Sequence, residues 1–120
     1  MNESQSQDIK TRTRDFALRI IKLYATLPKS VEAQVIGKQV LRSGTSVGAH
    51  YREASRAKSN PDFISKLEGG LQELEETSYW LELLAPAGIM PAERIASLLK
   101  ETGELTAIFI TMVKKVKAKA

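Results

Sequence analysis

Three glycines inside one long stretch of helical periodicity constrain the fold more than any other feature of this sequence. Between Ser30 and Lys58, apolar and small residues recur at alternating steps of four and three: Ile36, Val40, Ser43, Val47, His50, Ala54 and Ala57. This spacing places them on one side of an α-helix. Gly37, Gly44 and Gly48 lie in the same stretch, and a glycine inside a helix costs about 1 kcal/mol relative to alanine. The stretch therefore predicts a central helix whose neighbours compensate by packing close to its backbone.

Three more helices are predicted around this one. The first covers about residues 11–27 and ends before Pro28, because the residue that precedes a proline avoids helical geometry. The third begins with Asn60 as its cap and Pro61 in its first turn, and the fourth begins at Pro91. No segment has the pattern of a strand. The predicted fold class is therefore all-α, an antiparallel up-down-up-down four-helix bundle. Residues 1–10 are expected to form a flexible tail, which leaves residues 11–120 as the bundle domain, with a basic C-terminal end.

Composition excludes several classes of protein. The chain has no cysteine, so it can form neither disulfides nor thiolate metal sites. No apolar run approaches the roughly 20 residues of a membrane span, and the polar first seven residues lack the apolar core of a signal peptide. We therefore expect a cytoplasmic protein with no membrane partner. The net charge of +4 divides into +6 for residues 1–60 and −2 for residues 61–120, a balance compatible with an acidic partner.

A row of cations is the strongest candidate for a binding surface. Lys38, Arg42, Arg52 and Arg56 share one face of the central helix and extend over about 27 Å at 1.5 Å per residue. Such a row can follow the phosphates of a nucleic acid, and each neutralised phosphate releases counterions. The alternative is a solvated face whose arginines pair with Glu53 or with acidic residues of a neighbouring helix.

The segment from Tyr79 to Ala85 is apolar on nearly every side, whereas a helix of a four-helix monomer buries only one stripe. Either the proline-rich connection that follows covers the surplus, or a second subunit does. We favour the subunit. The predicted oligomer interface consists of Tyr79, Trp80, Leu83 and Leu84.

No catalytic, cofactor-binding or metal-binding residues are predicted. His50 is the only histidine, and a single histidine on a small-residue face is typical of a packed, hydrogen-bonded side chain. Di-iron bundles use Glu-x-x-His pairs, and no glutamate lies three residues before His50. The glutamates of the third helix lie mostly off its apolar stripe, which favours a solvated or subunit-bridging face. We therefore expect that the protein is not an enzyme.

Three stretches of the sequence resemble a known family. The segments RSGTSVGAHYREA (residues 42–54), DFISKL (62–67) and EETSYWLELL (75–84) are similar, in order and spacing, to the four helix bundle protein family. That family includes proteins encoded in intervening sequences of bacterial 23S rRNA genes. The resemblance covers roughly Phe16 to Phe109, and it departs from the family pattern at His50, where an asparagine is expected.

The resemblance implies a four-helix bundle that assembles into a ring-like pentamer. It also implies a distant relationship in fold to the accessory variability protein of diversity-generating retroelements, which is basic and associates with nucleic acid. No settled biochemical activity comes with the family. We therefore expect a non-enzymatic, homo-oligomeric module that docks on RNA or a nucleoprotein. The alternative is a structural or protein-binding assembly that makes no contact with nucleic acid.

Overall fold

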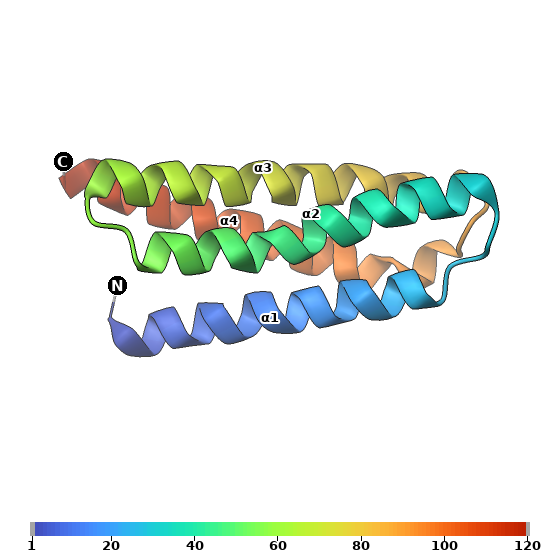
Figure 1. Ribbon diagram of the computed structural model, residues 1–120, viewed down its shortest axis with the longest axis horizontal. Helices are drawn as coiled ribbons and strands as arrows, with labels where there is room; N and C mark the ends of the chain where they lie inside the picture. Colours follow the sequence, from blue (N-terminus) through green and yellow to red (C-terminus); the bar gives the residue numbers. More distant parts are fainter. Residues whose placement is uncertain (1, 120) are drawn as a thin grey trace.

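The computed structural model describes residues 2–119 and confirms the predicted fold class. Four long helices, α1 (Glu3–Ala25), α2 (Val31–Ser55), α3 (Asn60–Leu84) and α4 (Ala96–Lys119), are joined by short connections, and no strand occurs in this part of the chain. A single turn of 3-10 helix, η1 (Ala92–Arg94), precedes α4. Successive helices alternate in direction along a body of 48 × 21 × 20 Å, so that both termini and the α2–α3 connection lie at the same end (Figure 1).

The small residues of α2 allow its neighbours to approach closely, as the sequence predicts. A Cβ atom on Gly44 would lie 2.8 Å from Cγ1 of Ile20, and one on Gly48 would lie 3.2 Å from Oγ1 of Thr13. Both neighbours belong to α1 and are fully buried. On the side toward α3, the Thr77 hydroxyl donates to Ser43 Oγ (2.8 Å). α1 and α3 therefore pack on opposite sides of α2, where larger side chains would hold them apart.

The core runs along the whole bundle and draws on all four long helices. Its largest members with less than 2% exposure are Tyr51, Phe16, Phe109, Ile20, Leu67, Leu74, Leu81, Leu84, Ile95 and Leu105. Burial of each such leucine or phenylalanine contributes about 1.5–3 kcal/mol. At the end that holds the termini, the ring centroids of Tyr51 and Phe109 are 6.0 Å apart, and the Tyr51 hydroxyl donates to Ser6 Oγ (3.0 Å).

That hydrogen bond reaches the segment for which the sequence predicts a flexible tail; in the structure, Glu3–Lys10 are helical and begin α1. Asn2 and Gln5 form a reciprocal cap: Gln5 N donates to Asn2 Oδ1 (2.8 Å), and Asn2 N donates to Gln5 Oε1 (3.2 Å). The cap satisfies backbone donors that a helix terminus otherwise leaves unpaired. Met1 and Ala120, which fall within the expected tail and domain, lie outside the described residues.

Two other helix starts also differ from the prediction. Ser59, rather than Asn60, caps α3, with Asp62 N donating to Ser59 Oγ (3.2 Å). Pro91 precedes η1, and α4 begins only at Ala96. The connection before it folds back, because Gly88 has a left-handed backbone (φ 73°) and Ile89 N donates to the carbonyl of Leu84 (2.9 Å).

The contact at Gly44 leads to a prediction about stability. In Gly44→Ala, the new methyl group would lie 2.8 Å from Cγ1 of Ile20, a fully buried side chain that would have to shift. Overpacking of this kind costs about 1–3 kcal/mol and should exceed the gain of about 1 kcal/mol in helix propensity. Gly103, in α4, has no atom within 4 Å of a built Cβ, so Gly103→Ala should stabilise the protein by up to about 1 kcal/mol.

Urea unfolding of the two alanine variants, followed by circular dichroism, measures both effects. Equal m-values would show that the unfolded states are comparable. If Gly44→Ala stabilised the protein as much as Gly103→Ala does, the close contact between α1 and α2 would be excluded.

Candidate functional site

The four cations of the predicted row are all exposed on the outer side of α2, but the structure divides them. Arg42 is engaged: its Nη1 donates to both carboxylate oxygens of Glu73 (3.2 and 3.4 Å), and its Nη2 donates to Glu76. The side chain of Glu73 is only 15% exposed. Arg42 therefore clamps α2 to α3, and its charge is largely compensated, as the alternative interpretation of the row anticipates.

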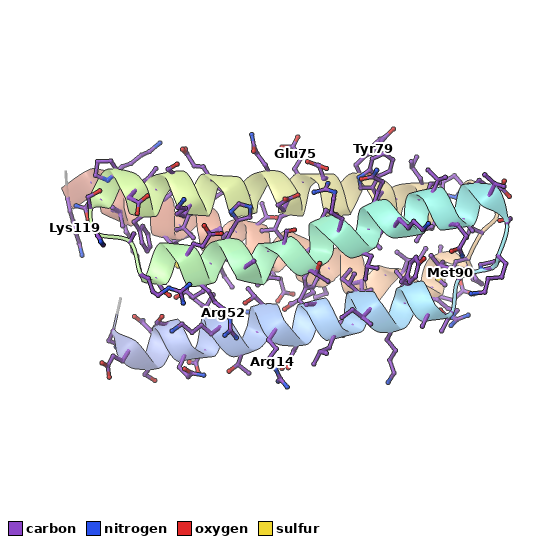
Figure 2. All side chains as sticks on the ribbon, viewed as in Figure 1. Arg14, Arg52, Glu75, Tyr79, Met90 and Lys119 are labelled. Carbon is purple, nitrogen blue, oxygen red and sulfur yellow. The ribbon has the colours of Figure 1, made fainter. Side chains whose placement is uncertain are left out.

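The other three cations of the row have no such partner. Within residues 2–119, no carboxylate lies within ion-pairing distance of Lys38, Arg52 or Arg56. Glu53, their predicted alternative partner, lies 3.6 Å from Lys66 instead. Figure 2 labels Arg52 in the half of α2 nearer the termini. Arg56 follows one turn later as the C-terminal cap residue of the helix.

Arg52 and Arg56 are thus close neighbours, whereas Lys38 is separated from Arg52 by 14 residues, or about 21 Å of helix. The compensated Arg42 lies between them. Positive charge near the C-terminal end of a helix is favourable to the helix itself, so Arg52 and Arg56 also stabilise α2.

More cations gather at the same end of the bundle. Lys58 lies in the α2–α3 connection, and the last turns of α4 carry Lys114, Lys115, Lys117 and Lys119. Of these, only Lys117 lies near a carboxylate of the described chain, that of Glu68 at 3.6 Å. Uncompensated cations from α2, the α2–α3 connection and α4 therefore gather at the end that holds both termini.

His50 is packed, as predicted, but the predicted hydrogen bonding is incomplete. Its ring lies over Gly69 of α3, where a built Cβ would come within 2.8 Å of Cε1 and Nδ1. Nε2 is 3.8 Å from Oε2 of Glu73, and Nδ1 is buried with no hydrogen-bond partner among residues 2–119. The glycine of α3 thus makes room for the imidazole ring beside the Arg42 clamp.

The four residues of the predicted oligomer interface differ in how much of each side chain is exposed. Leu84 is fully buried in the core of the single chain, so its side chain offers no surface to a second subunit, and the interface as a whole stays a prediction. Trp80 and Leu83 are half-buried. Tyr79 is 55% exposed and projects outward from α3 (Figure 2), with its ring centroid 5.0 Å from that of Trp80.

The connection after α3 accounts for this division. Met90 is buried, and Ile89 and Ala85 pack against the core. The connection after α3 therefore covers part of the apolar surface of the segment from Tyr79 to Ala85. The ring of Tyr79 stays exposed, and its coverage by a second subunit stays a prediction.

Sequence reasoning missed one cluster of charges, which lies between α1 and α4. Arg12 donates from Nε and Nη2 to the two carboxylate oxygens of Glu101 (2.8 and 2.7 Å), and from Nη2 to Glu104 (2.7 Å). These hydrogen bonds lower the pKa of Glu101 below its ordinary value of 4.5. Glu101 and Glu104 share one face of α4, but only the register of α4 against α1 shows that Arg12 lies opposite them.

Residues 2–119 hold neither a candidate metal site nor a candidate membrane span. No group of three or more His, Asp or Glu side chains is arranged to hold a metal ion. No helix in this range is both long and apolar enough to cross a membrane.

Comparisons with known proteins identify the family and the fold of this chain. A sequence model of the family described as 23S rRNA-intervening sequence protein matches residues 5–111. A crystal structure of a protein with unknown function from the S23 ribosomal protein family of Bacteroides thetaiotaomicron is 40% identical, with a TM-score of 0.84 over 91% of this chain and 97% of that chain. No curated protein sequence matches this chain.

Proposed function

The chain belongs to the 23S rRNA-intervening sequence protein family, and we propose that it is a non-enzymatic cytoplasmic module that binds RNA through the outer face of α2. The observation that carries this proposal is the division of the cation row. Arg42 is compensated by Glu73 and Glu76, whereas Lys38, Arg52 and Arg56 are exposed with no carboxylate in reach among residues 2–119. These three cations lie on one helix and keep their charge available to an acidic partner.

The chemistry of this face suits phosphates rather than bases. Guanidinium groups donate in pairs to phosphate oxygens, and no aromatic side chain lies among the cations of the row to stack on bases. We therefore expect binding that is independent of sequence and steeply dependent on salt.

This proposal predicts the effect of removing three charges from α2. In Lys38→Gln/Arg52→Gln/Arg56→Gln, the loss of up to three phosphate contacts should lower the slope of log affinity against log salt by about 2 for single-stranded RNA. The measurement is fluorescence anisotropy with a labelled RNA at two salt concentrations, after confirming that the melting temperature is unchanged.

A matched control separates this face from net charge. Lys22→Gln/Lys29→Gln/Lys100→Gln also removes three exposed cations that have no ion pair within the described chain, but none of them lies on α2. Its slope should stay near that of the parent. If the control lost as much affinity as the α2 variant, binding would reflect overall charge, and the α2 face would be excluded.

A second candidate function is self-association, either instead of RNA binding or together with it. The observation in favour is an exposed apolar surface on α2 and α3: Val35 is 57% exposed and Tyr79 is 55% exposed. The Ser43–Thr77 contact sets an antiparallel register that puts Val35 near the level of Ala85, about one and a half turns beyond Tyr79. Trp80 and Leu83, half-buried here, border this surface. The ring-like pentamer expected from the resemblance is the assembly we propose.

Light scattering at micromolar concentration tests the assembly. The parent should have the mass of an oligomer, and Val35→Asp/Tyr79→Asp should reduce it, because each charge would be buried at the interface. Leu18→Asp/Ile110→Asp replaces two apolar residues of similar exposure on α1 and α4 and should leave the mass unchanged. A parent that runs as a single chain would contradict the proposal.

A further inference from the structure

An apolar groove opens between the start of α1, the end of α4 and the α2–α3 connection. Its volume is about 960 Å³. The apolar side chains that line it are Ile9 from α1, Phe63 from α3, and Ile108, Met112 and Val116 from α4. All of these except Met112 are only partly buried. The groove thus exposes apolar surface that a closed bundle would cover with a neighbouring helix.

The way in which α1 and α4 are held together explains why this groove is open. Toward the far end of the bundle, long polar side chains bridge the two helices: Arg12 reaches Glu101 (2.7 Å), and Arg19 Nη2 donates to Ser97 Oγ (2.7 Å). Toward the termini, α4 diverges from α1 and passes behind α3 (Figure 1). The seam between them therefore widens at the end where the groove lies.

The rim of the groove is basic. Lys58, Lys115 and Lys119 line it, with Asp8 as the only acidic residue among the lining residues. None of the three lysines is within ion-pairing distance of a carboxylate of residues 2–119. An occupant of complementary charge would therefore be acidic where it meets the rim and apolar where it meets the floor.

We propose that this groove binds an acidic amphipathic helix of a partner protein. The α4 residues along it run from Ala107 to Lys119, which is about 18 Å at 1.5 Å per residue, or roughly three helical turns. A helix of about 12 residues with leucine-like side chains at i, i+3, i+4 and i+7 fills such a groove, and its flanking carboxylates meet the lysines.

The lining residues favour this occupant over a nucleic acid. Binding of unpaired bases relies on aromatic platforms, and Phe63 is the only aromatic residue in the groove, whereas its other apolar lining residues are aliphatic side chains that suit a leucine-rich helix face. The inference does not rest on RNA binding, because the three cations tested there lie on α2 and outside the groove.

The test uses the full chain and a labelled peptide of about 14 residues, with leucine at the four positions above and glutamate or alanine elsewhere. Fluorescence anisotropy measures its binding. Ala107→Gln/Thr111→Gln fills the groove from two exposed positions of α4 and should weaken binding at least tenfold. Lys115→Glu/Lys119→Glu reverses the rim charge and should do the same.

Two controls are matched to the test: a variant with the same two charge reversals elsewhere on α4, and a peptide with the same composition as the amphipathic one. Lys100→Glu/Lys114→Glu reverses two exposed lysines of the same helix that lie outside the groove, and it should change affinity by less than twofold. A peptide of the same composition with scrambled leucines should bind at least tenfold more weakly than the amphipathic one. The Lys38→Gln/Arg52→Gln/Arg56→Gln variant should keep full peptide affinity, so that failure of either proposal is seen separately.

Three outcomes would overturn the proposal. The first is a peptide that binds the filled variant and the parent equally. The second is a short single-stranded RNA whose affinity falls in the filled variant while the peptide does not bind, which would assign the groove to nucleic acid. The third is a lower mass of the filled variant in light scattering, which would assign the groove to a second copy of this chain.

Discussion

The close approach of α1 and α3 to the small residues of α2 determines the rest of this structure. α1 occupies the space that side chains at Gly44 and Gly48 would need, and α3 meets α2 through the Ser43–Thr77 hydrogen bond. A glycine also allows α3 and α4 to pack closely, since a Cβ on Gly70 of α3 would lie 2.7 Å from the ring of Phe109 in α4. The three consecutive helix pairs are therefore tight. In the fourth pair, α1 and α4, long side chains such as Arg12 bridge the two helices, and the helices diverge toward the termini.

This order of packing decides which charges remain available to a partner. Where the register of two helices sets a cation opposite a carboxylate, the two pair. Arg42 reaches Glu73 across the tight α2–α3 seam, and Arg12 reaches Glu101 across the looser α1–α4 seam. Arg52 and Arg56 lie at the end of α2, where no carboxylate of the described chain comes within reach. The lysines of the groove rim lie where α1 and α4 have diverged. The surfaces proposed to bind partners are thus those that the intramolecular packing leaves uncompensated.

The sequence predicted the features that depend on regular spacing along one helix. The α2 stripe, its glycines and the bundle class all follow from local pattern. The start of α1 did not, because its first turns have no apolar stripe, although Asn2 and Gln5 have the spacing of a reciprocal cap. Contacts between helices were harder still. That Arg42 is paired and Arg52 is not depends on the register of α3, and the burial of Leu84 beside the exposed Tyr79 depends on a connection that folds back at Gly88.

Native-state hydrogen exchange, measured amide by amide, tests the central claim most directly, because it reports the free energy of each local opening. If α2 is the element on which the bundle is built, its amides from Val40 to Tyr51 should exchange only through global unfolding, together with the facing amides of α3. The first turns of α1 and the last turns of α4, which border the groove, should exchange through smaller openings. Amides of α2 that exchange more readily than those at the ends of α1 and α4 would contradict this account.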